Sequence, residues 1–507
     1  MYPGRWAAEK GDSAAAINAA SGEVLSWREL DDRSNRVANL LRSVGLRVGD
    51  HIALLMENHL QYFEVAWAAF RSGLYITCIN RYLTAEEAAY IVADSGAKAI
   101  VASAAVIDPS ELAALIPDCP TRLLVRGQSP GWEPYEDRVA EHPTEPLREQ
   151  PMGDSMLYSS GTTGRPKGIK RPLTGLSVTD GIPGLDRASP YGIDGHSVYL
   201  SPAPLYHAAP FGFCMRTQAM GGTVVMMERF DVLESLANIE RYSITHSQWV
   251  PTMFVRMLKL EQAEREQFDL SSHRCAIHAA APCPVAVKQQ MMSWWGPIIW
   301  EYYAGTERNG STMVGPQDWL AHPGTVGRAR SGTLHICDEQ GNEVETGEEG
   351  LIYFEQASRP FVYHNAPEKT AESGHPHHDN WTALGDVGYV DEEGYLYLTD
   401  RKAFLIISGG VNIYPREIED ALILNDKVAD VAVFGVPNDE FGEEVKAVIQ
   451  PAPYVTGTPE LADELSAYAR EHLAGFKVPR SFDFIDEMPR LPTGKLYKRI
   501  LRDRYWE

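Results

Sequence analysis

Helical and strand-like patterns alternate through the first half of the chain. A capping box formed by Ser26 and Glu29 predicts the start of a helix. The apolar face of this helix comprises Leu30, Val37, Leu40, Leu41 and Val44, and Gly45 marks its end. Strand-like HIALLMEN, helical YFEVAWAAFRSG and the helix–strand pair AEEAAYIVADSGAKAIVAS follow in turn. This alternation predicts a mainly parallel sheet covered by helices.

The same alternation continues further along the chain. Strand candidates are SVYLSPAP, GTVVMME, SITHSQWVP, CAIHAAA and IIWEYYAG, and DVLESLANIERY has a helical pattern. Beyond Gly324 short strands are divided by turns, as in TLHICDEQGNEVETGEEGLIYFE, which predicts a small β subdomain. After Asp400 the helical runs REIEDALIL and ELSAYAREHLAG accompany the strand-like runs VADVAVFGVP and SFDFIDEMP, which predicts a compact α+β unit.

The length of the chain indicates more than one domain. At 507 residues it exceeds the size at which one hydrophobic core keeps growing. We therefore predict an α/β protein with a large N-terminal domain of helix-covered, mainly parallel sheets and a small β subdomain. A small α+β C-terminal domain follows a boundary near Asp400.

Charge and cysteine usage narrow the class of protein. The formal net charge of −23 argues against binding to nucleic acid or to anionic membranes, so an anionic ligand needs a local cationic site. The six cysteines include no C-x-x-C pair, which is typical of reduced thiols in a cytoplasmic protein. The first residues lack the apolar run of a signal peptide, and we expect no integral membrane segment.

A segment rich in hydroxyls, glycines and cations, YSSGTTGRPKGIKRP, begins at Tyr158. Its glycines let backbone N–H groups approach an anion, its hydroxyls can donate, and Lys167 adds a mobile cation. The P-loop pattern is not met, because Lys167 follows Gly164 by three residues. Taken alone, the segment is explained most simply as a flexible surface loop.

Three later segments change that interpretation. YSSGTTGRPKG resembles the phosphate loop of the adenylate-forming superfamily, which contains acyl-CoA synthetases, adenylation domains of peptide synthetases and luciferases. EYYAGTER resembles the family's aromatic-small-x-Thr-Glu signature, and WTALGDVGYVDEEGYLYLTDRKAFLIISGGVNIYPREIE resembles its hinge region. PRLPTGKLYKR resembles its C-terminal lysine motif, and the four segments occur in the family's order.

The resemblance implies that a carboxylate attacks the α-phosphorus of ATP, releases pyrophosphate and becomes an acyl-AMP. Lys495 would stabilise charge on the α-phosphate in the transition state. Glu307 would bind Mg²⁺, which prefers oxygen ligands, and Thr306 would reach the phosphates. The other implied nucleotide-binding residues are Ser159, Ser160, Gly161, Thr162, Thr163, Gly164 and Lys167 in the loop, Ala280, Ala281, Pro282, Glu301 and Tyr302, Tyr303 stacked on adenine, and Asp386 and Arg401 at the ribose.

The resemblance also implies a mobile C-terminal domain that turns about a hinge after the first step. The implied domains are 1–400 for ATP and acid binding, 401–403 for the hinge, with Ala403 as the hinge residue, and 404–507 for the lid that carries the lysine. Ala403, Phe404, Val411 and Leu384 depart from the family's usual residues. These departures bear on the second half-reaction more than on the first.

The implied acyl pocket mixes small and large apolar residues. It comprises Ala208, Ala209, Ala279, Ala280 and Gly305 together with Phe211, Phe213, Trp249 and Met313. This mixture predicts a walled pocket for an aryl or medium-length acyl group. His207 would lie beside the carboxylate, although a lone histidine is also commonly structural. SPAPLYHAAPFGF lacks the Asp with which peptide-synthetase domains pair the substrate's amino group, which disfavours an amino acid.

We therefore expect an AMP-forming acid–thiol ligase that uses ATP and Mg²⁺ and transfers the acyl group to coenzyme A. An amide synthetase that transfers the acyl group to an amine is the alternative, and a catalytically silent scaffold is disfavoured by Lys495, Glu307 and Asp386. No carrier domain follows Glu507, so the expected acceptor is diffusible, and a homodimer is compatible with the sequence. HPHHDN, from His375, is interpreted as a solvated turn and not as a metal site.

Overall fold

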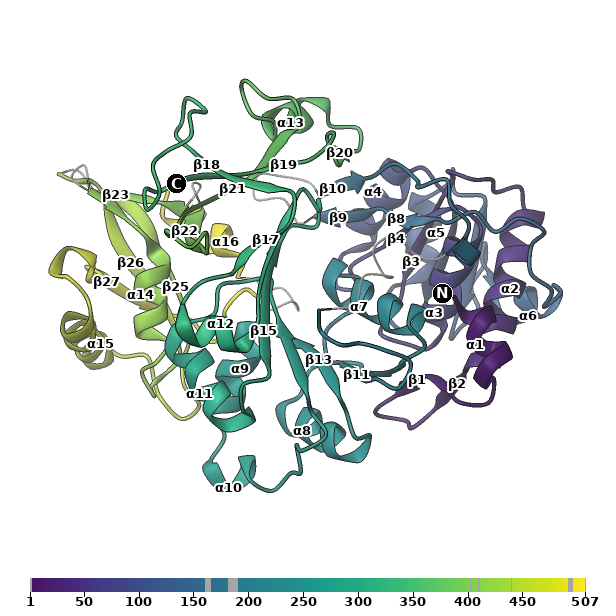
Figure 1. Cartoon of the computed structure of the whole chain (residues 1–507), viewed down its shortest axis with the longest axis horizontal. Helices are drawn as coiled ribbons and strands as arrows, with labels where there is room; N and C mark the ends of the chain where they lie inside the picture. The colour runs from purple at the N-terminus through teal and green to yellow at the C-terminus, as the bar shows by residue number, and fades with distance from the viewer. Residues whose placement is uncertain are drawn as a thin grey trace.

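The computed structural model describes residues 2–159, 166–180, 190–401, 404–408, 411–438, 440–490 and 496–506. The N-terminal part contains two large sheets with helices on their faces, and the C-terminal part forms a smaller unit beside them (Figure 1). Within these ranges, no helix is both long enough and apolar enough to cross a bilayer.

The first sheet has six strands, all parallel, in the order β7–β6–β5–β3–β4–β8. The strands are β3 (His51–Leu55), β4 (Tyr75–Cys78), β5 (Ala97–Ser103), β6 (Thr121–Val125), β7 (Glu133–Pro134) and β8 (Asp154–Ser155). The helices between them are α3 (Gln61–Arg71), α4 (Ala85–Ser95), α5 (Pro109–Leu115) and α6 (Tyr135–Ala140). Every residue of β3 and β4 is buried, because helices cover both faces of the sheet.

The second sheet has nine strands in the order β17–β16–β15–β14–β13–β11–β12–β1–β2. It is parallel from β15 to β1 and antiparallel at its edges. The strands are β1 (Ala14–Asn18), β2 (Val24–Ser26), β11 (Val198–Ser201), β12 (Thr223–Met226), β13 (His246–Trp249), β14 (Cys275–His278), β15 (Ile299–Ala304), β16 (Ser311–Val314) and β17 (Arg328–Ser331). The helices are α1 (Pro3–Lys10), α2 (Trp27–Ser43), η1 (Val178–Asp180), α7 (Ala208–Ala219), α8 (Val232–Arg241), α9 (Pro251–Leu258), α10 (Gln262–Arg265), α11 (Val285–Trp295) and α12 (Pro316–Ala321).

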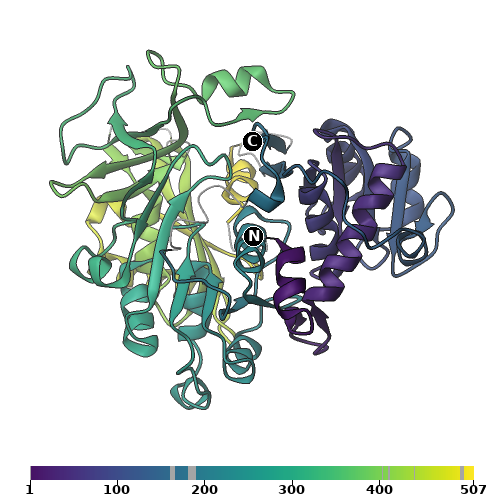
Figure 2. The same cartoon turned by 45° about the vertical axis from the view of Figure 1, so that its right-hand side comes forward.

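Helices α2, α3 and α7 lie between the two sheets. Their apolar side chains form one core with residues of both sheets, such as Ile52 of β3 and Val224 of β12. The other face of the six-stranded sheet packs against α4 and α5, and the other face of the nine-stranded sheet packs against α8, α9 and α11. Figure 2 shows α1 and α2, in purple, on the side of the molecule away from the C-terminal unit.

The sequence predictions for these elements are confirmed. The Ser26 side chain accepts from Glu29 N, and the Glu29 carboxylate accepts from Ser26 N at 2.9 Å, so the capping box opens α2 as expected. The five predicted strands of the second sheet correspond to β11–β15, and DVLESLANIERY forms α8. The expected α/β class with mainly parallel sheets follows from this topology.

The β subdomain is an antiparallel four-stranded sheet in the order β18–β19–β21–β22. Its strands are β18 (Thr333–Cys337), β19 (Gly350–Glu355), β21 (Trp381–Val390) and β22 (Leu396–Arg401), with α13 (Pro367–Glu372) beside them. A separate three-stranded sheet joins β9 (Leu157–Ser159), β10 (Lys167–Lys170) and β20 (Val362–Tyr363). This small sheet brings the hydroxyl-rich segment next to the β subdomain.

The C-terminal unit has its own sheet, in the order β24–β23–β26–β25 with β27 paired to β26. Its elements are β23 (Ile406–Ser408), β24 (Val411–Ile413), α14 (Pro415–Leu422), β25 (Val428–Asn438), β26 (Gly442–Pro451), α15 (Pro459–His472), η3 (Gly475–Lys477), β27 (Ser481–Phe484), α16 (Lys498–Arg502) and η4 (Asp503–Tyr505). Residues of α14 and α15 form its hydrophobic core with the sheet. Thus β22 ends at Arg401, and the first strand of the C-terminal unit begins at Ile406.

Candidate functional site

Tyr303 and Asp386 meet beside the end of β15. The Tyr303 hydroxyl donates a hydrogen bond of 2.7 Å to Asp386 Oδ2. Asp386 is 8% exposed and lies opposite Arg401 in the β21–β22 register. Residues directly opposite each other share a face of the sheet, so the backbone brings the two predicted ribose-binding residues together. The side chain of Arg401 lies outside the described part of the structure.

The loop after β14 lies next to this pair and carries backbone strain. β14 and β15 are parallel neighbours, so the residues that follow His278 run beside Tyr303. Ala280 is exposed and has a φ of 75°, a left-handed conformation that its Cβ disfavours. Such strain is found mostly where the surroundings enforce it, and it clusters at ligand sites. Ala281 and Pro282, which are half-buried, complete the loop.

Glu307 is a second acidic residue near the end of β15. It is 8% exposed, and the Tyr363 hydroxyl donates to its Oε1 at 2.8 Å. Lys167 Nζ lies 5.5 Å from the centre of the Tyr363 ring. Burial and the charge of Lys369 lower the pKa of Lys167, whereas Glu372 and Glu307 raise it. A carboxylate and a cation therefore flank one tyrosine, an arrangement suited to a magnesium–phosphate group.

The β9–β10 hairpin holds both ends of the hydroxyl-rich segment. Ser159 pairs with Lys167, and Tyr158 pairs with Gly168. The intervening predicted residues, Ser160, Gly161, Thr162, Thr163 and Gly164, lie outside the described residues. Tyr363 belongs to β20, which pairs with β10, and this pairing joins the hairpin to Glu307.

Glu301, which was predicted to bind the nucleotide, has its side chain in the core. Lys288 Nζ donates to Glu301 Oε2 at 2.6 Å, and His278 Nε2 lies 3.3 Å from the same oxygen. Burial by itself raises the pKa of Glu301, but the charges of His278 and Lys288 outweigh burial and hold the pKa well below its usual range. The Glu301 side chain is thus a buried structural anion. Only the backbone of Glu301 could contact a nucleotide.

The side chain of Tyr302 lies on the α7 side of the sheet, because successive residues of a strand face opposite sides. Its hydroxyl accepts a hydrogen bond of 3.1 Å from Gln248 Nε2, and its ring lies 5.9 Å from Phe213 of α7. Met313 pairs with Tyr302 in the β15–β16 register and shares its face. Tyr302, predicted as a nucleotide-binding residue, therefore joins Met313 on the side expected to hold the acyl group.

Trp249 and Phe211 do not line the acyl side as predicted. Trp249 is 1% exposed and packs 6.5 Å from Phe254 on the opposite face of β13, among α9 and α11. Phe211 is 2% exposed and lies in the core between the two sheets. Gln248 precedes Trp249 by one residue, and Phe213 follows Phe211 by two; these are the side chains that face Tyr302.

The start of α7 carries other predicted pocket residues. His207 is the residue before the first turn of α7, Ala208 begins the helix, and the His207 ring lies 4.1 Å from that of Tyr206. Gly305 is covered by Leu384, because a Cβ at Gly305 would lie 2.1 Å from Leu384 Cδ1. The unusual Leu384 thus packs directly on Gly305 and requires glycine there. Ala279, at 5% exposure, is buried at the end of β14.

Several side chains around the site were not predicted from the sequence. Gln248 and Tyr363 lie outside the four motifs, and their contacts join segments that are distant along the chain. Arg216 of α7 was also missed. Its signal was a single cation in the otherwise uncharged run HAAPFGFCMRTQA.

The predicted catalytic lysine and hinge fall on residues that the structure does not describe. Lys495 and Ala403 are both among them. Arg490 and Leu496, the described residues on either side of 491–495, pair with each other in an antiparallel bridge. The positions of Lys495 and Ala403 in the site therefore remain predictions.

The C-terminal unit contacts the N-terminal part through α14. Arg416 Nη1 donates to the Leu398 carbonyl of β22 at 2.7 Å. Lys498 Nζ forms an ion pair of 2.8 Å with Glu419 of α14 and lies 5.2 Å from the ring centre of Phe404. Phe404, one of the departures from the family pattern, is thus a packing residue beside the domain boundary.

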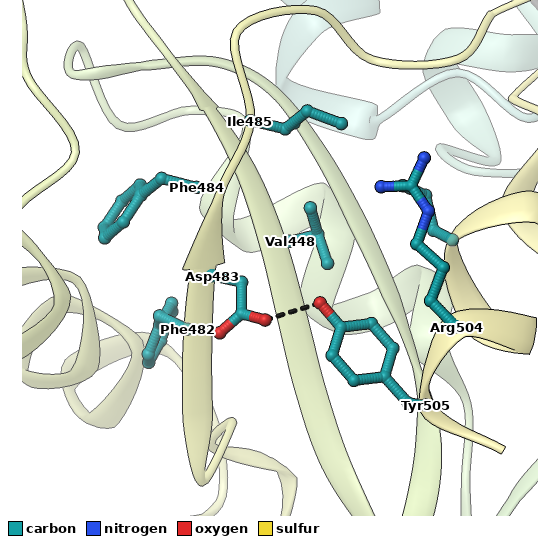
Figure 3. Close-up of a pocket in the computed structure, with 8 residues that line it drawn as sticks. Val448, Phe482, Asp483, Phe484, Ile485, Arg504 and Tyr505 are labelled. Atoms are coloured by element: carbon teal, nitrogen blue, oxygen red, sulfur yellow. Dashed lines mark hydrogen bonds between the residues drawn. The ribbon is translucent and has the colours of Figure 1, made fainter. Parts of the chain in front are cut away.

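A hollow of about 340 Å³ lies in the C-terminal unit, apart from these residues (Figure 3). Its lining consists of Val448, Phe482, Asp483, Phe484, Ile485, Leu501, Arg504 and Tyr505. The Tyr505 hydroxyl donates to Asp483 Oδ2 at 2.5 Å across it. No predicted site residue belongs to this lining.

The histidine-rich turn is exposed at residues 376–379, as predicted, whereas His375 is buried. His375 is 7% exposed, and its Nε2 lies 2.9 Å from the Gly341 carbonyl oxygen. The ring of His378 stacks on Trp381 at 4.2 Å. Among the described residues, no group of three or more His, Cys, Asp or Glu side chains is placed to hold a metal ion.

Comparison with known proteins identifies the family. Residues 4–359 match the family described as AMP-binding enzyme, and residues 417–495 match the AMP-binding enzyme C-terminal domain. The chain is 34% identical over 513 residues to the 3-[(3aS,4S,7aS)-7a-methyl-1,5-dioxo-octahydro-1H-inden-4-yl]propanoyl:CoA ligase of Rhodococcus jostii, covering 96% of this chain and 95% of that protein. It is 33% identical over 487 residues to a feruloyl-CoA synthase of Amycolatopsis, covering 96% and 94%.

Solved structures give the same result. The amide bond synthetase McbA of Marinactinospora thermotolerans superposes with a TM-score of 0.81 at 26% identity and 99% coverage of both chains. ATP-bound MatB of Rhodopseudomonas palustris superposes with a TM-score of 0.82 at 28% identity, covering 100% of this chain and 99% of MatB. Together with the four motifs and the arrangement of Tyr303, Glu307 and Asp386, these matches show that the chain belongs to the AMP-binding, adenylate-forming enzyme family.

Proposed function

We propose that this chain activates a carboxylic acid with ATP and transfers the acyl group to coenzyme A. The observation that carries the proposal is the 2.7 Å bond between Tyr303 and Asp386. It fixes an aromatic ring beside a carboxylate, as the adenine and ribose of one nucleotide require. The two relatives above are a CoA ligase and a CoA synthase, which supports the choice of thiol acceptor.

The nucleotide would occupy the edge formed by β15 and β21. The Tyr303 ring would stack on adenine, and Asp386 would accept hydrogen bonds from the two ribose hydroxyls. The Tyr303 hydroxyl holds Asp386 in place before ATP arrives, so less ordering is needed on binding. The strained loop at Ala280 would approach the other face of the base.

Glu307 suits Mg²⁺ that arrives with ATP. Mg²⁺ is usually held by one or two carboxylates together with phosphate oxygens and water. Glu307 supplies one buried carboxylate, and a search of the described residues finds no cage of three ligating side chains. The ion would screen the phosphates, and Lys167 on the far side of Tyr363 would take part of their charge.

The first step joins two anions, so it needs cations near the reacting atoms. A carboxylate oxygen attacks the α-phosphorus, the bond to the β-phosphate oxygen breaks, and pyrophosphate leaves. Lys495 is proposed to stabilise charge on the α-phosphate, and residues 159–167 are proposed to hold the β- and γ-phosphates. In the second step the thiol sulfur attacks the acyl carbon, AMP leaves, and the thiol proton passes to solvent.

The acid would lie between α7 and the nine-stranded sheet. Tyr302, Met313 and Phe213 supply large walls, and Ala208 supplies a small one at the start of the helix. His207 is proposed to lie beside the reacting carboxylate. These walls suit an aryl or medium-length acyl group.

An amine acceptor is the second candidate. McbA, whose structure this chain resembles, is an amide bond synthetase. Phe404 packs under Lys498 at the domain boundary, where the family commonly has an acidic residue. This change affects the part of the protein that is proposed to move between the two half-reactions.

The test is pyrophosphate release by the purified chain with Mg²⁺, ATP and a panel of aryl and fatty acids. Release with at least one acid is expected, and the absence of release with every acid would contradict the proposal. Mass spectrometry of reactions supplied with coenzyme A or with simple amines then decides the acceptor. Lys495→Ala should abolish adenylate formation while largely retaining thiolysis of supplied acyl-AMP. A cytoplasmic location and a homodimeric state stay predictions from the sequence.

A further inference from the structure

Arg216 lies on α7 far from the proposed position of the reacting carboxylate. It follows His207 by nine residues, which places it about 13 Å further along the helix axis at about 1.5 Å per residue. It also follows Gly212 by four residues, so the two share a helix face. A Cβ on Gly212 would meet no atom within 4 Å. Open space therefore lies beside Gly212, on the helix face that carries Arg216.

Aromatic rings lie on the same side of α7, because Phe213 precedes Arg216 by three residues and faces Tyr302. The Arg216 guanidinium is close enough to Tyr191 and Tyr302 to interact electrostatically with both hydroxyls. The Tyr191 ring lies 5.7 Å from Phe213 and 5.6 Å from Trp300. Tyr302 and Phe213 are the walls already assigned to the acyl side. Arg216 therefore lies in the same space as the acid and not on an unrelated surface.

Among the described residues, the formally charged side chain that acts on Arg216 is another arginine, Arg308. Burial lowers the pKa of Arg216, and the charge of Arg308 lowers it further. Arg308 also lies near Arg171, which forms an ion pair of 2.6 Å with Asp154. Within the part of the chain that the structure describes, no carboxylate forms an ion pair with Arg216 or Arg308.

Arg308 is exposed and keeps its hydration, whereas Arg216 is half-buried. A partly buried guanidinium loses hydration and needs an anion or several acceptors to offset that loss. The chain as a whole carries a net charge of −23, so carboxylates are abundant elsewhere. Arg308 also has a φ of 52°, a strained conformation directly after Glu307. The half-buried guanidinium of Arg216 therefore favours an anionic ligand.

We propose that Arg216, with Arg308 beside it, binds a second anionic group of the acid substrate. The preferred substrates are then aryl acids with a second negative charge across the ring from the reacting carboxylate. The rings of Tyr302 and Phe213 receive the aryl group, and the guanidinium receives the distal anion through a planar pair of N–H donors. This inference rests on the proposed function and narrows its substrate class.

Loss of Arg216 should weaken binding more than turnover. The distal anion makes the same contact in the ground state and in the transition state, so its loss raises KM and leaves kcat less affected. A hydrogen bond to a charged group contributes about 1.5–3 kcal/mol, which corresponds to about 10- to 150-fold in affinity.

The experiment compares matched acids that differ only in the distal group. The pairs are benzene-1,4-dicarboxylate against 4-methylbenzoate, and 4-carboxycinnamate against 4-methylcinnamate, with pyrophosphate release as the readout. For each acid, kcat and KM are measured for wild type, Arg216→Met, Arg216→Lys and the control Arg241→Met. Arg241 is an exposed arginine on α8, stacked on Tyr242 and remote from the pocket.

Wild type should use each dianion with a kcat/KM at least about tenfold above that of its methyl partner. Arg216→Met should reverse this preference, Arg216→Lys should keep part of it, and Arg241→Met should match wild type. The inference is overturned if wild type prefers the methyl acids, or if Arg216→Met lowers both members of a pair equally. Pyrophosphate release without dianion preference defeats this inference alone, whereas the absence of release with every acid defeats the proposed function.

Discussion

Replacing Asp386 by Ala removes the carboxylate that the Tyr303 hydroxyl holds at 2.7 Å. Asp386 is 8% exposed, so its hydrogen bonds form in a partly desolvated site. Each charge-assisted bond to a ribose hydroxyl contributes about 1.5–3 kcal/mol. The loss of two such bonds, about 3–6 kcal/mol, predicts a fall of about 10²- to 10⁴-fold in kcat/KM for ATP.

The assay is acid-dependent pyrophosphate release at varied ATP, with the acid saturating. Tyr303→Phe keeps the ring and removes only the hydroxyl, so it should have a smaller effect, within about 20-fold. Asp483→Ala is a matched control, because Asp483 also accepts from a tyrosine, Tyr505, but lies in the C-terminal hollow. The control should leave kcat/KM for ATP unchanged. If Asp386→Ala retained wild-type kcat/KM, or if the control lost as much, Asp386 would have no special contact with ATP.

Lys288→Met should lower the free energy of unfolding by about 3–5 kcal/mol, because it leaves Glu301 buried without its 2.6 Å partner. Denaturant unfolding measures this loss, and adding Glu301→Gln should restore part of it. Ala280→Gly should retain ATP affinity, whereas Ala280→Val should reduce it, since a β-branched residue tolerates a φ of 75° poorly; isothermal titration compares them. Burial, together with Lys170 and His364, lowers the pKa of His51 to about 4 in the folded protein. The unfolded chain therefore binds a proton first, and stability should fall as pH drops from about 6.5 to about 4, a fall that His51→Gln reduces in melting curves.

The nucleotide side of the site could be anticipated from the sequence. Tyr303, Glu307 and Asp386 occur in segments whose residue order resembles the family, and the structure brings Tyr303 into hydrogen-bond contact with Asp386. The parallel sheets could also be anticipated, because helical and strand-like periodicities alternate along the chain. Local patterns carry this information, since each motif is contiguous.

The acyl side could be anticipated only in part. Both faces of a covered parallel sheet are apolar, so the run SITHSQWVP does not show which side each residue faces. Trp249 was therefore placed in the pocket, although Gln248 holds the pocket-facing position. The sequence of α7 is equally ambiguous. It does not distinguish Phe211, which lies in the core, from Phe213, which faces the proposed acid site.

Contacts between distant segments had no signal in the sequence. The pairing of Glu307 with Tyr363 depends on β20 joining β10, which composition does not reveal. Arg216 gave one weak signal, its charge in an otherwise uncharged run, but a single cation in a helix normally faces water. The neighbouring Arg308 and the open space beside Gly212 are the structural observations that indicate a ligand contact for Arg216.

The most direct test of the account follows the oxygen atoms of the acid. The purified chain is supplied with ATP, Mg²⁺, coenzyme A and an accepted acid whose carboxylate carries ¹⁸O. If the carboxylate attacks the α-phosphorus, one of its oxygens remains on AMP when the acyl group leaves, so mass spectrometry should find one ¹⁸O atom in AMP and none in pyrophosphate. Unlabelled AMP, or formation of ADP with labelled phosphate, would contradict an acyl-AMP intermediate.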